Sequence, residues 1–420
     1  MRKTIFFLLF IFILSKLSSQ NIDYAKSVID TLSSKYFCGR GAVNNGEKKA
    51  AEFIAKEFNK SGLKKFNNTF FQEFNYPINT FPGKLSVSLE QTQLIAGEDY
   101  IVDAASGKIR GTFQLVWYNK ENVPTKKQLK KLVSVGFFSN KFIVIDEKGV
   151  ENKNELFRLL KLNVFGAEGI ILIENEKLTQ HLSSSYNDFG ILRIKREKIS
   201  REYKSITLEI DQTFIRDYQS QNVIGYVEGT EQPDSFVVLS AHYDHLGTMG
   251  EKVFFPGAND NASGIAMLLN LVYHYTHKEL PKKTIIFIAF GAEEAGLIGS
   301  KYFVEHSMVS LEKIKFVFNM DLMGTGSEGA MIVNGSILPY QFGQLQKINA
   351  LNDYLEVIKK RGKAANSDHY WFSEKGVPSF FIYLMGGIKA YHDIEDIFKT
   401  LPLTEFEDSF RLIRDFVDEM

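Results

Sequence analysis

Histidines and carboxylates recur in five short segments of the chain, each lying at or close to the end of an apolar run or in a polar loop. They are His242 and Asp244 in SAHYDHLG, Asp260 in GANDNASG, Glu293 and Glu294 in FGAEEAG, Asp321 in NMDLMG, and His392 in YHDIED. Imidazole nitrogens and carboxylate oxygens are ligands that zinc takes in catalytic sites. Together these side chains could hold two zinc ions and supply a catalytic base.

Three apolar runs predict the buried strands that would bring these side chains together. They are residues 236–240 (FVVLS), 284–290 (TIIFIAF) and 316–320 (FVFNM), each bounded by turn residues. Such runs are typical of strands buried on both faces of a largely parallel sheet. Open α/β sheets bind ligands beyond the carboxyl ends of their strands. The sequence therefore predicts a metal site along one edge of the sheet.

Each candidate ligand could instead have a purely structural role that involves no metal. A lone histidine after a strand is more often hydrogen-bonded than metal-bound. His242 is favoured as a ligand because Asp244 follows two residues later, on the same side of an extended chain, where its carboxylate can accept the imidazole proton and orient the ring. Asp260 could be a turn or helix-cap residue, since DNASG is typical turn sequence. The two roles can coexist.

The remaining candidates are weighed in the same way. Glu293 and Glu294 could be favoured by the dipole at a helix start. As neighbours at the mouth of a sheet they repel each other, and a divalent cation would relieve that repulsion while leaving one of them free as a base. Asp321 ends an apolar strand, where an unpaired charge is costly unless a metal compensates for it. His392, in the loop AYHDIEDIF, carries little information on its own.

Length and composition indicate a folded protein with more than one domain. The 420 residues are 44% hydrophobic, which is enough for a sizeable core. Lysine plus arginine equals aspartate plus glutamate, at 50 each, and no long basic run occurs. This balance gives no support for a nucleic-acid partner or an anionic membrane surface. Cys38 is the only cysteine, so no intrachain disulfide can form, and a structural role is expected for it.

The first 20 residues resemble a secretory signal. Arg2 and Lys3 precede the apolar run 5–14, and the polar stretch SKLSSQ follows it. The run is well short of the roughly 20 residues that a membrane-spanning helix needs. We therefore expect cleavage near Ser19 or Gln20, no stable membrane insertion, and export to the periplasm, the cell surface or the medium.

The rest of the chain divides into an interrupted α/β domain and an insertion. Residues 21–90 are expected to start the main domain, with helices over 25–34 and 47–58. Residues 91–205 are expected to form an inserted β-rich domain, with strand-like runs at 113–119, 137–147 and 169–175 and a helix over 151–162. Residues 206–420 complete the main domain.

Strands and helices alternate through this last part of the sequence. VIGYVEG is expected as an edge strand and FVVLSAH as a central one, and strand-like runs also occur at 284–290, 315–321, 355–359 and 379–385. Helices are expected over 264–275, 297–305, 341–350 and 404–417. The predicted fold class is three-layer α/β, a mixed but mainly parallel sheet flanked by helices.

The ordered motifs HYDHLG, GANDNASG, GAEEAGLIGS, NMDLMG and YHDIED closely resemble those of the co-catalytic dizinc aminopeptidases, the family-28 zinc metallopeptidases. The resemblance covers the chain from about Gln221 to the C terminus and, more loosely, residues 47–63. The insertion resembles a protease-associated domain, chiefly through FGAEGIILIEN. The family fold is that of the zinc exopeptidases, related to phosphorylase and hydrolase folds.

The resemblance implies a role for each candidate. Asp260 would bridge two zinc ions, one held also by His242 and Asp321 and the other by Glu294 and His392. Asp244 would support His242, Glu293 would be the general base, and Tyr391 would donate a hydrogen bond to the developing oxyanion. A cis peptide bond is implied between Asp260 and Asn261. Asp368 and His369, in NSDHYWF, would contact substrate or support the metal ligands.

The implied activity is hydrolysis of the first peptide bond at a peptide or protein N terminus. Glutaminyl cyclases share the fold with one zinc, but the DNASG motif and Tyr391, where the cyclases carry tryptophan, favour a peptidase. A carboxypeptidase of the same superfamily would need basic residues for the substrate carboxylate. A non-catalytic relative would have lost its ligands, whereas all are present here. The preferred N-terminal residue, the substrate length and the oligomeric state stay open.

Overall fold

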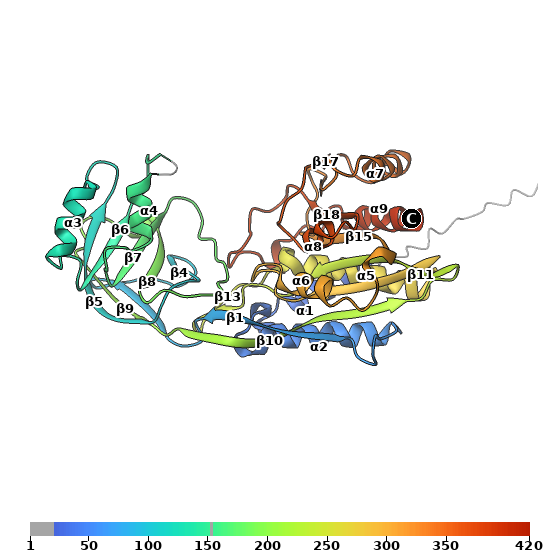
Figure 1. The fold of residues 1–420 in the computed structure, drawn as a ribbon, viewed down its shortest axis with the longest axis horizontal. Helices are drawn as coiled ribbons and strands as arrows, with labels where there is room; N and C mark the ends of the chain where they lie inside the picture. Colours follow the sequence, from blue (N-terminus) through green and yellow to red (C-terminus); the bar gives the residue numbers. More distant parts are fainter. Residues whose placement is uncertain (1–20, 152–153) are drawn as a thin grey trace, which may run out of the picture.

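The computed structural model describes residues 21–151 and 154–420 as two lobes, each built on an eight-stranded sheet (Figure 1). The signal sequence predicted for residues 1–20 lies outside the described residues. Within those residues, no helix combines the length and apolarity needed to cross a membrane.

The first lobe contains a mixed sheet with a parallel centre. In spatial order its strands are β1 (Phe71–Thr80), β10 (Thr213–Val227), β14 (Lys283–Phe290), β11 (Gln232–His242), β15 (Ile314–Asp321), β18 (Ser379–Leu384), β16 (Ala330–Val333) and β17 (Ile358–Lys360). Strands β14, β11, β15 and β18 are mutually parallel, while β10 and β16 flank them in the antiparallel sense. The parallel strands end at the same edge of the sheet.

Helices cover both faces of this sheet. Residues 285, 287 and 289 of β14 contact a large core, whereas 286, 288 and 290 contact a second one, as the twofold alternation of a strand requires. The first core includes α1 (Ile22–Leu32), α2 (Gly46–Lys60), α5 (Gly264–His277), α7 (Pro339–Asn352) and α9 (Phe406–Asp418). The second includes α6 (Ile298–Glu305) and α8 (His369–Glu374). The three-layer α/β fold predicted from the sequence is confirmed.

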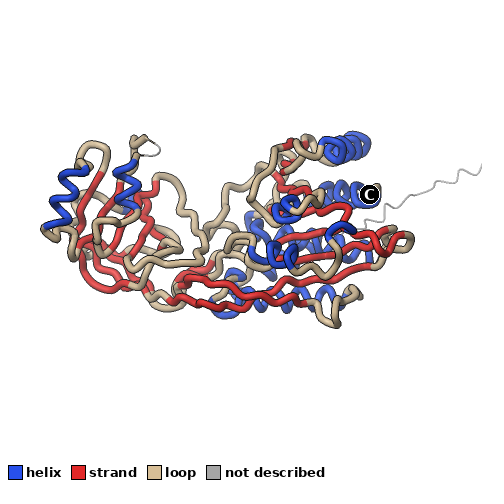
Figure 2. Tube along the Cα trace, viewed as in Figure 1, coloured by secondary structure: helices blue, strands red, loops and turns tan. Residues whose placement is uncertain are grey.

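The second lobe has its own mixed sheet, seen at the far end of the molecule from the C terminus (Figure 2). Its strands, in spatial order, are β3 (Thr92–Gln93), β2 (Leu85–Leu89), β9 (Ser205–Ile210), β5 (Ile109–Tyr118), β6 (Lys141–Ile145), β7 (Gly169–Glu174), β8 (Gly190–Lys195) and β4 (Tyr100–Val102). Helices α3 (Lys126–Ser134) and α4 (Glu155–Lys161) pack on one face. The likeness of this lobe to a protease-associated domain stays a prediction.

The long antiparallel pair β1 and β10 carries the chain into the second lobe and back. The edge-strand prediction for VIGYVEG is wrong for the strand as a whole: residues 223–227 end β10, and β1 pairs with the earlier part of β10, residues 213–223, while β14 pairs with 223–227. The sequence predicts no strand at 71–80. That segment alternates polar and apolar residues, which favours a strand, but it contains Pro77, and a proline within such a run argues against a strand.

His274 on α5 makes the stability of the fold sensitive to acid. Its ring is buried against Tyr275 and Phe410, and neither ring nitrogen has a hydrogen-bond partner among the described residues. Burial, followed by the charge of Arg414, lowers the pKa of His274 to about 4. Between the ordinary pKa and this value the unfolded chain binds a proton that the folded chain does not, so stability falls as the pH falls through that window.

We therefore expect His274→Phe to lose less stability than the wild type between about pH 7.5 and about pH 5. The difference should be on the order of 1 kcal/mol, discounted for solvent screening, and is measurable by urea unfolding. The exposed His277 on the same helix offers the control His277→Phe, which should keep the wild-type pH dependence. An unchanged pH dependence in His274→Phe would contradict this account.

Candidate metal centre

The predicted site residues meet beyond the carboxyl ends of the parallel strands. His242 is the last residue of β11 and Asp321 the last of β15, and Glu293 and Glu294 follow β14 after a short turn. Asp260 lies in the turn of Ala258–Ser263 that leads into α5, and His392 lies in the loop after β18. The cis peptide bond implied between Asp260 and Asn261 is present.

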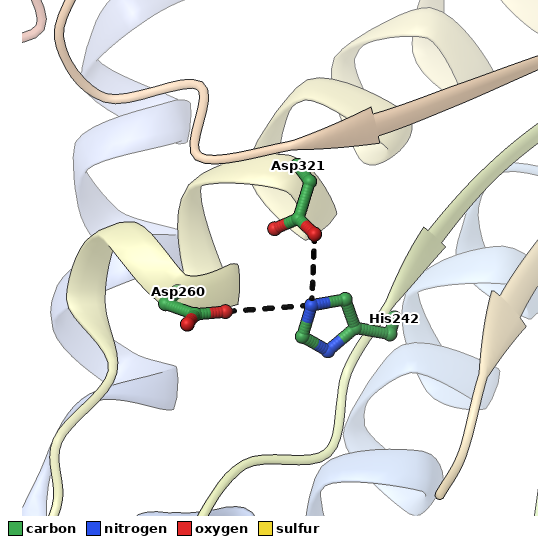
Figure 3. A group of neighbouring side chains, drawn as sticks. All are labelled: His242, Asp260 and Asp321. Atoms are coloured by element: carbon green, nitrogen blue, oxygen red, sulfur yellow. Dashed lines mark ion pairs between the residues drawn. The ribbon is translucent and has the colours of Figure 1, made fainter. Parts of the chain in front are cut away.

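The first half of the site is formed by His242, Asp260 and Asp321 (Figure 3). Nε2 of His242 lies 3.4 Å from Oδ1 of Asp260 and 3.3 Å from Oδ2 of Asp321. All three side chains are buried, and Oδ1 of Asp321 has no hydrogen-bond partner among the described residues. An unsatisfied buried carboxylate oxygen is costly, so this group is suited to a cation.

The second half of the site shares Asp260 with the first. Nε2 of His392 lies 3.1 Å from Oδ2 of Asp260 and 3.1 Å from Oε2 of Glu294. Asp260 therefore directs one carboxylate oxygen toward each histidine. This is the arrangement expected of a carboxylate that bridges two cations.

The distances between ligand atoms fit zinc. Zinc bonds to imidazole and carboxylate are about 2.0–2.2 Å, and in a tetrahedron of that size neighbouring ligand atoms lie about 3.3–3.6 Å apart. The four distances in the two halves, 3.1 to 3.4 Å, lie at or slightly below the lower end of this range. Each half also offers mixed nitrogen and oxygen ligands, as catalytic zinc sites do.

The site attracts positive charge. Burial opposes ionisation of Asp260 and Glu294, but the histidines outweigh it, so the pKa of Asp260 is held well below its usual range and that of Glu294 falls to about 2. Burial also opposes protonation of His392, yet Glu294 and Asp260 raise its pKa to about 11. Because zinc needs a neutral imidazole, zinc binding would release a proton from this histidine.

Glu293 differs from the ligands around it. Its carboxylate makes no hydrogen bond within the described part of the chain, and it lines the cleft above the ligands. Burial raises the pKa of Glu293 well above its usual range, and Glu294 adds to the effect against the opposing charge of His242. A raised pKa makes a carboxylate a stronger base, and a general base must take up a proton.

Asp244 makes different contacts from those predicted. The sequence predicts that its carboxylate accepts the imidazole proton of His242. In the structure, Nδ1 of His242 lies 3.2 Å from the backbone carbonyl of Asp244 and 3.7 Å from its carboxylate. The carboxylate accepts instead from the backbone N–H groups of Glu293 and Glu294, at 3.0 and 3.1 Å. Two converging amides satisfy a buried carboxylate well, so Asp244 positions the glutamate turn.

The less specific candidates divide between the cleft and the interior. Tyr391 lines the cleft, and its ring stacks on that of His392 with centroids 4.0 Å apart. Asp368 and His369 are fully buried and are not among the residues that line the cleft. Asp368 adds negative charge near Glu293, and His369 packs against Phe381 of the cleft wall. Their positions fit support of the site and do not fit direct contact with substrate.

Three site residues have no assigned role in the sequence interpretation. Arg40 is fully buried and donates to five backbone carbonyls, among them those of Gly257 and Asp260. The carboxylate of Asp396 accepts from the N–H groups of Asn259 and Asp260, at 2.9 and 3.0 Å. Together they hold the turn that presents Asp260. Asp396 falls within the motif YHDIED, but Arg40 lies in a segment without a recognisable signal.

His245 is the third of these residues. Its Nδ1 lies 2.9 Å from Oε1 of Glu294, and its Nε2 is buried without a partner among the described residues. His245, Asp260 and Glu294 also form a group with the spacing of metal ligands. Since Oε2 of Glu294 faces His392, the contact with His245 orients that carboxylate. In the sequence, the one sign of this role is that His245 is the second histidine of the motif HYDHLG.

The site opens into a cleft of about 240 Å³. Besides the candidate ligands, Glu293 and Tyr391, the cleft is lined by Leu322, Arg361, Asn366, Phe381 and Tyr383. The cleft therefore combines the charged side chains of the candidate ligands with the apolar side chain of Leu322 and three aromatic rings.

Comparisons with known proteins agree with the fold and the motifs. Residues 222–417 match Peptidase family M28. Aminopeptidase YwaD of Bacillus subtilis (strain 168) is 30% identical over 383 residues, covering 84% of this chain and 74% of that protein. The structure of BSAP, a zinc aminopeptidase from Bacillus subtilis, has a TM-score of 0.73 at 23% identity and covers 94% of both chains. The structure of the aminopeptidase from Aneurinibacillus sp. strain AM-1 has a TM-score of 0.67 at 20% identity and covers 95% of this chain and 93% of that one.

Proposed function

Since the chain belongs to peptidase family M28 and is a zinc metallopeptidase, we propose that it acts as an exported aminopeptidase with two zinc ions. The observation that carries the proposal is the position of Asp260, with one oxygen toward His242 and the other toward His392. Glu293 stands beside these ligands with a free carboxylate. The relative YwaD, which carries the name aminopeptidase, supports the direction of cleavage.

The residues have separate tasks in the proposed reaction. His242, Asp260 and Asp321 would hold one zinc ion, and Asp260, Glu294 and His392 the other. When bound, such a pair of ions acidifies a water molecule and polarises the scissile carbonyl. Glu293 takes a proton from the attacking water and returns it to the leaving amine.

Tyr391 has a suitable place to stabilise the developing oxyanion. Its ring stacks on His392 at the cleft wall, and partial burial, with the nearby charges of Asp260 and Glu294, raises the pKa of Tyr391 above its usual value. The hydroxyl therefore stays protonated and able to donate a hydrogen bond at neutral pH. Export is proposed from the signal-like character of residues 1–20.

Three substrates and a zinc count test the proposal. The purified protein is assayed on an aminoacyl anilide, on a peptide with N-terminal glutamine, and on a peptide blocked at its N terminus with a free C terminus. Two bound zinc ions with release of the aniline support an aminopeptidase. Cyclisation of the glutaminyl peptide with one zinc, or release of the C-terminal residue, would replace the proposed activity with that of a cyclase or a carboxypeptidase.

Among the described residues that line the cleft, Arg361 is the one arginine or lysine. It follows β17, its backbone is held by hydrogen bonds to Ile332 and Ser336, and its exposed side chain has no ion pair within the described residues. A free guanidinium in a cleft favours a carboxylate of the substrate. That carboxylate could be the side chain of an acidic N-terminal residue or, in a carboxypeptidase, the C terminus.

We expect Arg361→Ala to lower kcat/KM for a glutamyl anilide about tenfold, the usual effect of losing one hydrogen bond to a charged group. Activity on a leucyl anilide should stay within about twofold, since that substrate carries no carboxylate near Arg361. Arg361→Lys should restore part of the glutamyl activity. Equal losses on both anilides would contradict recognition of an acidic side chain.

A further inference from the structure

The second lobe reaches the metal centre through the segment between β7 and β8, residues 175–189, which we call the lobe loop. It contains no helix or strand, yet it contacts the loop of residues 389–393 that carries His392. These contacts join residues more than 200 positions apart in the chain. They give the lobe a direct connection to a proposed zinc ligand.

Two hydrogen bonds link Gln180 of the lobe loop to His392. The backbone N–H of Gln180 donates to the carbonyl of His392 at 2.9 Å, and Nδ1 of His392 lies 3.0 Å from the carbonyl of Gln180. A carbonyl can only accept, so Nδ1 carries the proton of the imidazole. When the imidazole is neutral, as zinc binding requires, its lone pair is therefore on Nε2, which faces Asp260 and Glu294.

Lys177 of the lobe loop holds the same segment from outside. Its Nζ donates to the carbonyls of Lys389 and Tyr391, at 3.0 and 2.7 Å, and pairs with Asp393 at 3.0 Å. His392 itself has a φ of 55°, a left-handed backbone that is uncommon for a residue with a side chain. Such a conformation persists where surrounding contacts determine it, and here those contacts come from Lys177 and Gln180.

The lobe loop is in turn anchored at its base. The side chain of Gln180 donates to the carbonyl of Val102 on β4, and Leu178 is buried in a core that also contains Leu246 and Phe255 of the first lobe. The segment that faces His392 is therefore fixed to both lobes.

From these contacts we propose that the second lobe completes the metal centre. Lys177 and Gln180 are positioning residues that fix the tautomer and orientation of His392, so the lobe contributes to zinc affinity as well as to the shape of the cleft. Partners of this kind on a metal-ligating histidine typically contribute 10- to 100-fold in metal affinity or activity. The inference rests on the zinc site of the proposed function.

The test measures zinc affinity in the full chain by competition with a chelator, with no substrate present. We expect Lys177→Ala to lower the affinity for one of the two zinc ions about tenfold and to leave the affinity for the other unchanged. Lys177→Arg, which keeps a cation able to reach the carbonyls, should recover most of the loss. Gln180→Ala, which removes the side-chain hydrogen bond to Val102 at the base of the lobe loop, should lower the affinity for the same ion.

Lys126→Ala is the matched control. It removes a lysine from the same lobe, where Lys126 pairs with Glu155 at 2.6 Å on an exposed surface, and zinc affinity should not change. Unchanged affinity for both ions in Lys177→Ala and Gln180→Ala, or an equal loss in Lys126→Ala, would overturn the proposal. Wild-type protein that binds two zinc ions but releases no aniline would contradict the proposed activity alone, because the affinity comparison needs no substrate.

Discussion

Glu293→Gln should retain both zinc ions and lose roughly 10²- to 10⁴-fold in kcat, the usual contribution of a general base. Glutamine has the shape of glutamate but cannot take up the proton of the attacking water. The ligands should be undisturbed, because Glu293 contacts Asp244 through its backbone N–H, which the substitution keeps. Removing one carboxylate also relieves repulsion with Glu294, so the melting temperature should not fall.

The experiment combines zinc content, thermal unfolding and turnover of the same preparation. KM should change little, since the expected loss is of proton transfer and not of substrate binding. Full turnover in Glu293→Gln would remove Glu293 from the role of base. Loss of zinc would instead place it among the ligands.

Asp260→Ala should have the opposite signature, with loss of the metal itself. Asp260 is the residue that faces both histidines, so its removal takes one ligand from each half of the site. Zinc content should fall from two ions toward none, and turnover should become undetectable. The variant should also gain no stability from added zinc, whereas ligand binding to the native state stabilises the wild type.

Asp99→Asn provides the control for this variant. Asp99 is also buried, but in the second lobe, where it accepts from the backbone of Ile95 and pairs with Lys198. The substitution should reduce stability and leave zinc content unchanged. Two zinc ions retained in Asp260→Ala would exclude the bridging role.

The two variants together distinguish loss of proton transfer from loss of the bound metal ions. In Glu293→Gln the metal centre should persist without its base, and in Asp260→Ala the base should persist without its metal centre. Buried groups such as Arg40 and Asp396 contribute to both results, since they hold the turn that carries Asp260. Their hydrogen bonds explain how a buried carboxylate is kept in place between two histidines.

Much of the site could be predicted because its information is local in the sequence. An apolar run that ends in HYD or NMD specifies both a buried strand and the side chain at its carboxyl end, and parallel strands bring such ends to one edge. His242 and Asp321 lie there as expected. The edge strand at 71–80 was missed although its alternating pattern favours a strand, because Pro77 interrupts the run and its partner, β10, lies about 140 residues away.

The sequence by itself determined the fold class, the family and the set of residues that gather at the sheet edge, because each depends on short contiguous patterns. Only the tertiary structure decided how those residues are held. It showed that the carboxylate of Asp244 supports the glutamate turn, that Arg40 fixes the turn of Asp260, and that a carbonyl 212 residues away orients His392. These contacts use backbone groups, which every residue type carries, so no side-chain pattern records them and only the folded chain brings them within hydrogen-bond distance.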